Sequence, residues 1–255
     1  MTDPRAALDF KGRVVLVTGG TRGIGRAIVA RFAEAGATTI SCGRTPPTEP
    51  LPGEFHACDV RQSEAVRVMA DAIGAKHGHI DVLINNAGGS PAAEAANASP
   101  RFSEAIIALN LLAPLHVSQA CWRWMQDDGG AIINIASVSA VRPSPGTAAY
   151  AAAKSGLLGL TRSLAQEWAP KIRVNAIIAG LIETETAENT YGAPAAQAAL
   201  AASVPLQRLG LGADIANAAL YLASPLASFV TGAELLVHGG GERPPFLDIV
   251  AAHGG

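Results

Sequence analysis

The feature that most constrains the fold is a glycine-rich turn near the N-terminus, within the segment RVVLVTGGTRGIGRAIVARFAEAG. A short apolar run, residues 14–18, leads directly into Gly19-Gly20-Thr21-Arg22-Gly23-Ile24-Gly25, and a helical pattern follows. Glycines allow a tight turn and let backbone N–H groups approach a pyrophosphate, which the helix N-terminus also stabilises. Such a turn is also compatible with an ordinary strand-to-helix connection. A strand before it, a helix after it and a second strand about 20 residues further on favour a dinucleotide site.

Beyond this turn, short apolar runs alternate with helical patterns along the chain. Most of the runs are continuously apolar, which is typical of strands that are covered on both faces. Regular alternation of strands and helices favours an α/β fold, with a parallel sheet between two layers of helices. The predicted strands are residues 14–18, 38–42, 55–58, 82–85, 132–136, 173–178 and 234–237, and the predicted helices are residues 23–35, 63–77, 100–125, 147–168 and 213–223.

The length of 255 residues suits one large domain or two small ones. No stretch has the character of a domain linker, so we expect a single domain over residues 1–255. Residues 183–204 have weak periodicity, and we expect a mobile substrate-loop insertion there with one or two short helices. Residues 241–255 form a C-terminal tail that contains prolines, glycines and one apolar patch.

A formal net charge of −2 and the lack of a basic block argue against binding to nucleic acid or to an anionic membrane. The three cysteines are scattered, without the spacing of a zinc site or a disulfide framework, so we expect no metal. The N-terminus lacks the apolar segment of a signal peptide, and no apolar run reaches the ~18 residues of a membrane span. These features predict a reducing, cytoplasmic location.

A second motif, SVSAVRPSPGTAAYAAAKSG, places Tyr150 four residues before Lys154. Four residues are about one helical turn, so the two side chains lie on the same helix face. Ser137 precedes them at the end of a predicted strand, and the carboxyl ends of parallel strands line the ligand crevice. Reduction of a ketone by hydride leaves an alkoxide that must take up a proton. An unperturbed tyrosine has a pKa of about 10, and a neighbouring ammonium group lowers that pKa.

Alone, Tyr-x-x-x-Lys is a common pattern that often marks only a surface contact. Together with Gly19-x-x-x-Gly23-x-Gly25 and the segment Asn85-Asn86-Ala87-Gly88, it resembles the classical type of the short-chain dehydrogenase/reductase family. The resemblance covers roughly residues 12–240. It implies a Rossmann-type, doubly wound parallel sheet of seven strands in the order 3-2-1-4-5-6-7. It also implies an oxidoreductase that interconverts a ketone and a secondary alcohol by hydride transfer.

The resemblance assigns four residues to catalysis. Tyr150 would be the acid/base, and Lys154 would lower the pKa of Tyr150 and hold the nicotinamide ribose. Ser137 would orient the carbonyl oxygen, and it is favoured over Ser139 because only Ser137 has the family's spacing to the tyrosine. Asn110, in the segment ALNLLAPL, matches the residue that holds a helix kink and a water in the proton relay. Without the resemblance, Asn110 would pass for an ordinary polar helix residue.

The choice of dinucleotide depends on the end of the second predicted strand, ISCGRTPP. Sites for NAD usually carry an acidic residue here, which accepts a hydrogen bond from the ribose 2′-OH. This chain has Gly43 and then Arg44, and a guanidinium group can bind the 2′-phosphate of NADP. Arg22, in the glycine-rich turn, would supply a second cation. We therefore expect NADP(H) rather than NAD(H), although Arg44 would also suit a solvated loop.

Further cofactor contacts are implied by the resemblance alone. Asp59 would bond the adenine amino group, although Asp59 or Ser63 would also serve as a helix N-cap. Ile182 would pack on the nicotinamide and bond its carboxamide, but the family's usual proline before Gly180 is absent here, which predicts a looser turn. The full expected cofactor-binding set is Gly19, Thr21, Arg22, Gly23, Ile24, Gly25, Arg44, Asp59, Val60, Asn86, Ala87, Gly88, Tyr150, Lys154, Gly180, Ile182 and Thr184.

The substrate is less strongly indicated than the reaction. Residues 183–204 contain no Lys or Arg, which favours a neutral, largely apolar ketone or a 3-oxoacyl thioester over a small anion. A non-catalytic NADP-sensing or scaffold protein would share the fold, but such proteins tend to lose the tyrosine or the lysine. An epimerase or dehydratase of the extended family would need a substrate domain after the sheet, and only about 15 residues follow the last predicted strand.

A homo-oligomer is also expected. Apolar residues make up 49% of the chain and charged residues only 16%, a composition that indicates surface buried between subunits. In the family, two neighbouring helices form a four-helix interface, which implies a dimer or tetramer. Leu157, Leu160, Leu164 and Trp168 recur on one stripe of the Tyr150 helix and suit either core packing or that interface.

Overall fold

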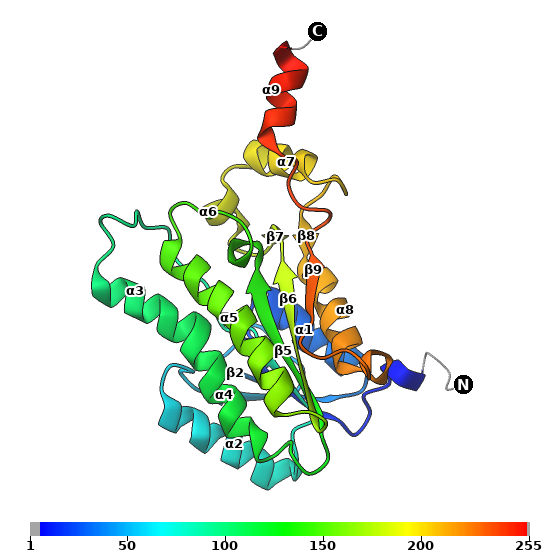
Figure 1. The fold of residues 1–255 in the computed structure, drawn as a ribbon. Coiled ribbons are helices and arrows are strands. Elements are labelled where there is room, and N and C mark those ends of the chain that lie inside the picture. The colour runs from blue at the N-terminus through cyan, green and yellow to red at the C-terminus, as the bar shows by residue number, and fades with distance from the viewer. Residues whose placement is uncertain (1–5, 254–255) are drawn as a thin grey trace.

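Seven parallel strands form the main sheet of the computed structural model, which describes residues 6–253. Their order is β3-β2-β1-β4-β5-β6-β9, which confirms the predicted order because β9 is the seventh strand of this sheet along the chain (Figure 1). Residues 1–5 and 254–255, the ends of the expected domain and tail, lie outside the described residues. The strands are β1 (Val14–Thr18), β2 (Thr38–Gly43), β3 (Glu54–Ala57), β4 (Val82–Asn85), β5 (Gly130–Ser137), β6 (Ile172–Ala179) and β9 (Glu234–Val237).

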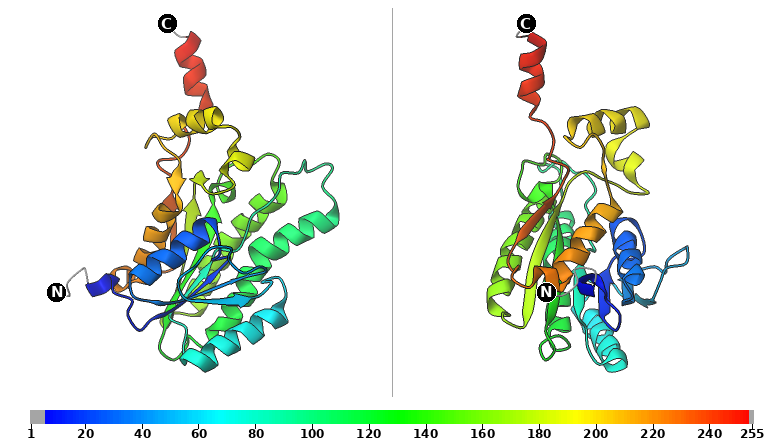
Figure 2. Two further views of the ribbon diagram at one scale, coloured as in Figure 1. Left: turned by 180° about the vertical axis from the view of Figure 1, so that it is seen from behind. Right: turned by 90° about the vertical axis from the view of Figure 1, so that its right-hand side faces the viewer.

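Helices cover both faces of this sheet, as the continuous apolar runs predicted. Leu16 of β1 packs in a cluster with residues of the helices on one face, whereas Val15 and Val17 pack with those on the other. All five residues of β1 are buried. Figure 2 shows the two layers from behind and from the side. One layer holds α1 (Gly23–Glu34) and α8 (Gly212–Ala223), and the other holds α2 (Ser63–His77), α3 (Pro100–Ile107), α4 (Ala113–Trp122) and α5 (Ala148–Glu167).

The predicted helix over residues 100–125 is interrupted. A π-helical segment, η2 (Ala108–Leu112), separates α3 from α4, and the helix ends at Trp122. The side chain of Asn110, inside η2, donates a hydrogen bond to Ile106 O at 2.9 Å, where a backbone N–H would otherwise bond. Insertions of this kind often mark functional sites in helices.

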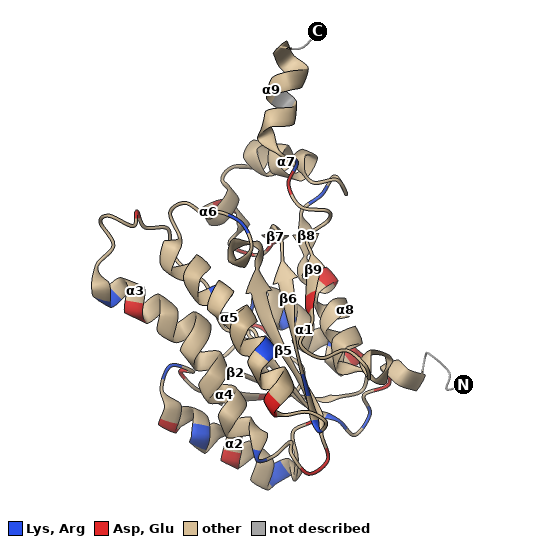
Figure 3. Ribbon diagram, viewed as in Figure 1, with Lys and Arg blue, Asp and Glu red and all other residues tan. Residues whose placement is uncertain are grey.

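Residues Pro100–Trp122 are long and apolar enough for a membrane span by length and composition, with a mean hydropathy of 1.4 over the best window. No such run had been expected from the sequence. Within the structure, 39% of that window is buried, and α4 packs against α2 while α3 packs against α5. The core helix of a folded domain has the same properties. Figure 3 shows Lys and Arg interspersed with Asp and Glu along α2, without a region of one sign.

Additional elements lie above the carboxyl ends of the strands. Residues 183–204 contain the expected short helices, α6 (Ala187–Tyr191) and α7 (Pro194–Ser203). Two short strands that the sequence did not predict, β7 (Ile182–Glu183) and β8 (Gly210–Leu211), pair as a separate sheet. The tail forms α9 (Pro245–His253), also not predicted, which projects from the body (Figure 1). The 3₁₀ turns are η1 (Ala6–Leu8), η3 (Val138–Ala140) and η4 (Pro225–Ala227).

Candidate functional site

The end of β5 and the first turns of α5 bring three of the predicted residues together. Ser137 is the last residue of β5, and Tyr150 and Lys154 lie one turn apart on α5. Lys154 is only 4% exposed, and its Nζ donates a hydrogen bond to Ile135 O at 2.7 Å. The same nitrogen lies 5.7 Å from the centroid of the Tyr150 ring. The predicted spacing therefore places a hydroxyl, a phenol and an ammonium at the carboxyl edge of the sheet.

Burial controls the protonation of both titratable groups. It lowers the pKa of Lys154 to about 8, because the ammonium is desolvated among buried neighbours. It also raises the pKa of Tyr150, and a hydrogen bond with Ser137 only partly offsets that rise. The net shift of the Tyr150 pKa in this structure is thus upward, and the lowering expected from Lys154 together with an oxidised nicotinamide stays a prediction. Desolvation of the phenol is the largest cause of that shift, while the Lys154 ammonium is hydrogen-bonded to a backbone carbonyl.

Asn110 joins the same site from η2, which packs against α5 within the same helix layer. Its Oδ1 accepts a hydrogen bond from Gly89 N at 2.9 Å, and its Nδ2 donates to Gly89 O at 3.0 Å. A Cβ added to Gly88 would lie 2.7 Å from Asn110 Oδ1 and 3.3 Å from Lys154 Nζ. Asn110 and Lys154 thus converge on residues 86–89, which follow β4 and which we call the strand-end segment. The π-helical segment turns the Asn110 amide inward, fully buried, toward this point.

The glycine-rich turn and the strand-end segment after β4 interlock. Asn86 Nδ2 donates hydrogen bonds to Thr18 O at 2.9 Å and to Gly19 O at 3.2 Å. Thr18 Oγ1 in turn accepts from the backbone N–H groups of Asn86 and Ala87, both at 3.0 Å. A Cβ on Gly25 would lie 2.3 Å from Gly19 O, so α1 can begin this close to the strand only with glycine there. The result is a backbone cradle at the N-terminus of α1.

The strand ends are aligned by buried amides beneath the cradle. Asn85 Nδ2 donates to Asn134 Oδ1 at 2.8 Å, between β4 and β5. Asn134 Nδ2 donates to Thr161 Oγ1 on α5 at 2.9 Å, and Thr161 Oγ1 donates to Leu157 O at 2.8 Å. The Asn85 and Asn134 amide nitrogens and the Thr161 hydroxyl are therefore satisfied in the core, whereas Asn85 Oδ1 is buried without a hydrogen-bond partner among the described residues.

The residues predicted to select the dinucleotide lie at the rim of the cradle. Arg22 is the N-cap residue of α1, and Arg44 follows β2; both are exposed. Asp59 is held by Arg61, whose Nη2 and Nε lie 2.6 Å and 2.9 Å from its two carboxylate oxygens, and this pairing lowers the pKa of Asp59. The alternative reading of Asp59 or Ser63 as a helix N-cap is wrong, because Gln62 is the N-cap residue of α2.

The turn after β6 closes the site from above. A Cβ on Gly180 would lie 2.6 Å from the Cβ of His238, so the close packing of these two residues requires glycine. Ile182 is buried, and the Thr184 Cγ2 lies 3.4 Å from the place where a Cβ on Gly23 would be. The turn thus runs over the glycine-rich loop despite the missing proline.

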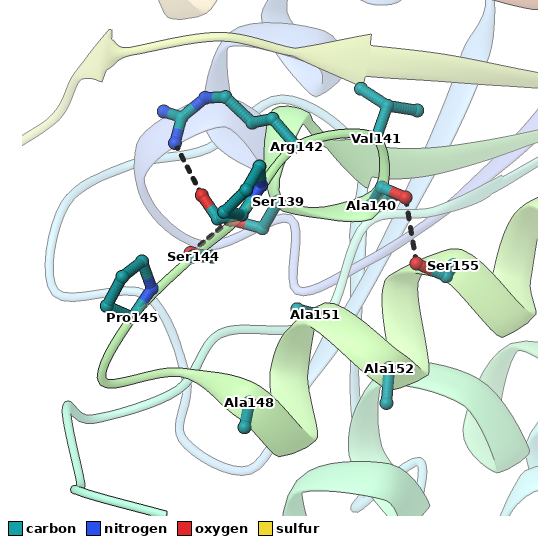
Figure 4. Close-up of a pocket in the computed structure, with 11 residues that line it drawn as sticks. Ser139, Ala140, Val141, Arg142, Ser144, Pro145, Ala148, Ala151, Ala152 and Ser155 are labelled. Carbon is teal, nitrogen blue, oxygen red and sulfur yellow. Dashed lines mark hydrogen bonds between the residues drawn. The ribbon is translucent and has the colours of Figure 1, made fainter.

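A cavity of about 540 Å³ lies beside this site, between η3 and the outer face of α5 (Figure 4). Ser139 lines it and hydrogen-bonds Ser144 at 3.0 Å, while Ser155 donates to Ala140 O at 2.8 Å. Ser137, Tyr150 and Lys154 do not line this cavity. The cavity is therefore separate from the cluster around Lys154, and Ser139 belongs to the lining of the cavity.

A family model described as enoyl-(acyl carrier protein) reductase matches residues 19–242, and curated relatives match nearly the whole chain. The chain belongs to the short-chain dehydrogenase/reductase family. A 3alpha-hydroxysteroid dehydrogenase of Mediterraneibacter gnavus is 36% identical over 246 residues, 90% of this chain and 97% of that protein. A 3-oxoacyl-[acyl-carrier-protein] reductase of Thermotoga maritima is 34% identical, with 91% and 99% covered.

Solved structures agree with this assignment. The ligand-free aldohexose dehydrogenase of Thermoplasma acidophilum superimposes with a TM-score of 0.87 at 33% identity, covering 91% of this chain and 94% of that one. The named activities of these relatives place the chain among the oxidoreductases. The roles of Ser137, Tyr150, Lys154 and Asn110 stay predictions, now with a geometry in which the four residues share one site.

Two site residues of this short-chain dehydrogenase/reductase were not predicted. The N–H of Gly23 donates to the carboxylate of Glu185, and the hydroxyl of Tyr191 bonds the backbone of Ile182. Tyr191 also lies near enough to Tyr150 to raise its pKa. Both residues come from the segment expected to be an insertion. Their only signal in the sequence was membership of that segment, which lies after the cofactor turn.

Replacing Gly25 with alanine is expected to weaken dinucleotide binding at least tenfold in this enzyme. The new methyl group would meet Gly19 O at 2.3 Å and Asn86 Nδ2 at 2.4 Å, so the cradle would have to open. Small-to-large changes in packed sites cost about 1–3 kcal/mol, and the melting temperature should fall as well. Calorimetric titration with NADPH measures the first effect. Gly159→Ala is the control, since its methyl group meets nothing within 4 Å. Equal affinity in both variants would contradict the assignment of the cradle.

Proposed function

We propose that this chain is an NADP(H)-dependent oxidoreductase that interconverts a ketone and a secondary alcohol. The observation that carries the proposal is the buried Lys154 ammonium beside Tyr150, at the edge of the sheet where the glycine-rich cradle opens. The cradle fits a dinucleotide, because Gly23 N already bonds an anionic oxygen, that of the Glu185 carboxylate. The dinucleotide would be held by the cradle and by the turn that carries Ile182, and when bound it supplies or accepts the hydride.

Each proposed catalytic residue has a separate task. The Tyr150 hydroxyl would donate a proton to the alkoxide oxygen as it forms, and would take that proton back in the reverse direction. Ser137, which hydrogen-bonds Tyr150, would hold the same oxygen in line. Lys154 would stabilise the phenolate left behind, because its charge lies close to the ring in a desolvated place. Asn110 would hold the strand-end segment and, through it, the space in front of Lys154.

Arg44 supports the preference for NADP(H). It is exposed at the rim with Arg22 nearby in the turn, and the carboxylate of Asp59 is neutralised by Arg61. Replacing Arg44 with glutamine is expected to weaken NADPH binding about 10- to 100-fold, because a hydrogen bond to a charged group contributes about 1.5–3 kcal/mol. Affinity for NADH, which lacks the 2′-phosphate, should change little.

Titration of both variants with NADPH and NADH measures this preference. Arg101→Gln, at an exposed position on α3, is the control and should leave both affinities unchanged. A wild-type protein that binds NADH as tightly as NADPH would contradict the proposed preference for NADP(H). The proposed reaction would not be affected by that result.

The proposed substrate is a neutral, largely apolar ketone or a 3-oxoacyl thioester. Two arginines near the candidate site are already paired: Arg142 with Glu242, and Arg208 with Asp214 at 2.7 Å. The α7 helix above the site carries no charged residue. Similarity to 3-oxoacyl-[acyl-carrier-protein] reductases and to a hydroxysteroid dehydrogenase supports the same classes.

The test is NADPH oxidation at 340 nm with ketones, 3-oxoacyl thioesters, quinones and sugars. Turnover of one class establishes the reaction and names the substrate class. NADPH binding without turnover of any class would instead support a sensing or scaffold role.

We also propose a cytoplasmic homo-oligomer with no nucleic-acid or membrane partner. Leu112 and Trp122, at the two ends of α4, and Val141, beside α5, are large apolar side chains that are 42%, 38% and 53% exposed. Burial of these side chains against a second copy would remove apolar surface from water. Size-exclusion chromatography with light scattering measures the assembly, and a monomer at micromolar concentration would contradict it.

A further inference from the structure

Two side chains from residues 184–191, which we call the covering segment, bond backbone groups of the proposed cofactor site. The N–H of Gly23 donates to both carboxylate oxygens of Glu185, at 3.0 Å and 3.1 Å. The hydroxyl of Tyr191 accepts from Ile182 N at 3.1 Å and donates to Ile182 O at 3.3 Å. These contacts lie at opposite ends of one short segment that contains α6. They occupy two separate groups of backbone atoms that a bound dinucleotide would use.

The first contact is one that a phosphate would make. Gly23 is the first residue of α1, so its N–H has no partner within the helix. Arg22, the N-cap residue, supplies no side-chain bond to the helix end. A negative charge at this place is stabilised by the helix dipole and by the N–H that has no partner within the helix. Helix N-termini bind pyrophosphate for the same reason. Glu185 therefore brings an anion to the point where the cradle favours one.

The second contact is one that a primary carboxamide would make. A carboxamide offers an N–H donor and a carbonyl acceptor, and it can bond the C=O and N–H of one residue together. The hydroxyl group of Tyr191 makes both of these hydrogen bonds through its one oxygen: it accepts from Ile182 N and donates to Ile182 O. The resemblance to the family had led us to expect the nicotinamide carboxamide at the backbone of Ile182. Tyr191 thus completes the hydrogen bonds of this backbone in place of the cofactor.

We propose that the covering segment imitates the dinucleotide, with Glu185 in place of the pyrophosphate and Tyr191 in place of the carboxamide. The inference rests on the proposed function in taking a dinucleotide as the ligand. Two anions do not share one N–H, so binding requires Glu185 to leave, and the Ile182 backbone must lose Tyr191. The apparent association constant for the cofactor is then the intrinsic constant multiplied by the fraction of molecules in which the segment is open.

The ends of the segment allow such a movement. α6 ends at Gly192, whose φ of 82° lies in the left-handed region that glycine adopts without strain. Glu185 is exposed, so its carboxylate can pass directly from Gly23 into water. Ala187 is the one buried residue of α6, and the half-buried ring of Tyr191 is the other apolar surface that the opening would expose.

Titrations of Glu185→Ala and Tyr191→Phe with NADPH and with inorganic pyrophosphate test the inference. The alanine variant should bind both ligands about fivefold more tightly, because the internal competitor is gone. The phenylalanine variant should also bind both ligands more tightly, because loss of the bonds to Ile182 favours the open segment, and the gain should be larger for NADPH, since pyrophosphate does not reach Ile182. Glu188→Ala is the matched control, an exposed carboxylate in the same covering segment whose side chain makes no hydrogen bond to the described residues, and it should bind like the wild type.

Amide hydrogen exchange of the protein alone tests the contact without any cofactor. The Gly23 amide should be protected in the wild type and exchange several-fold faster in Glu185→Ala. Equal exchange in the two proteins, or unchanged or weaker NADPH binding by Glu185→Ala, would overturn the inference and leave the proposed function intact. Failure of every variant to bind NADPH or NADH would overturn the proposed function and, with it, the dinucleotide as the imitated ligand.

Discussion

Replacing Tyr150 with phenylalanine is expected to lower kcat/KM for ketone reduction by about 10³-fold. Phenylalanine keeps the ring beside Lys154 and removes only the hydroxyl that would transfer the proton. Loss of a positioned general acid typically reduces the rate by about 10²- to 10⁴-fold. The dissociation constant for NADPH should change only a few-fold, because most of the expected cofactor contacts lie on other elements. NADPH oxidation at 340 nm with the substrate class identified above measures the rate.

The control for this change is Tyr221→Phe, at a tyrosine on α8 that is 39% exposed. It should retain wild-type activity, and the circular dichroism spectra of all three proteins should coincide. A Tyr150→Phe enzyme with more than a tenth of the wild-type rate would show that the proton comes from elsewhere. The cluster of Ser137 and Lys154 would then need another donor.

Replacing Lys154 with methionine is expected to stabilise the fold at pH 7 while it lowers kcat/KM by about 10²-fold or more. The native protein must hold this amine in a buried place, where its pKa falls from 10.5 to about 8. At pH 7 the ammonium is charged in both the folded and the unfolded chain, and only the folded chain bears its desolvation. Methionine has a similar length and no charge. Each pKa unit corresponds to about 1.4 kcal/mol, so the gain should be about 1–3 kcal/mol after loss of the bond to Ile135 O.

The pH dependence separates this effect from simple repacking. Because the folded pKa is depressed, the unfolded chain binds more protons than the folded chain between pH 8 and 10.5. Wild-type stability should therefore rise with pH across this window, and the advantage of Lys154→Met should shrink in step. Urea unfolding at pH 7, 8 and 9.5 measures both proteins. Lys171→Met, at an exposed position, is the control and should show no such convergence. A constant difference at all pH values would contradict the role of the buried charge.

The nucleotide-binding half of the fold could be predicted because its signals are local. Gly25 is required by a contact between neighbouring turns of one segment, and the continuous apolar run of β1 reflects burial on both faces. Tyr150 and Lys154 were also predictable as a pair, since helical spacing alone sets them side by side. For Asn110, only the resemblance gave a role. Its convergence with Lys154 on Gly88 depends on the packing of two helices.

The features that were missed depend on contacts between distant segments or on burial. Glu185 and Tyr191 reach their partners only when the covering segment folds over the cradle. The π-helical insertion lies within a long, largely apolar segment, so the sequence indicated one continuous helix. The net rise of the Tyr150 pKa was not predicted, because residue spacing shows the nearby lysine and not the loss of water around the phenol.

The amides that join β4, β5 and α5 have a consequence for strand alignment. A parallel strand that is apolar on both faces can slide along its neighbour by two residues and still bury similar side chains. Such a slip would separate Asn85 from Asn134 and leave polar groups unsatisfied in the core, at a cost of about 1–3 kcal/mol for each group. The hydrogen bond from Asn134 to Thr161 extends the same constraint to the helix that carries Tyr150 and Lys154. The register of the sheet, and with it the placement of the site, is thus encoded by side chains that no substrate touches.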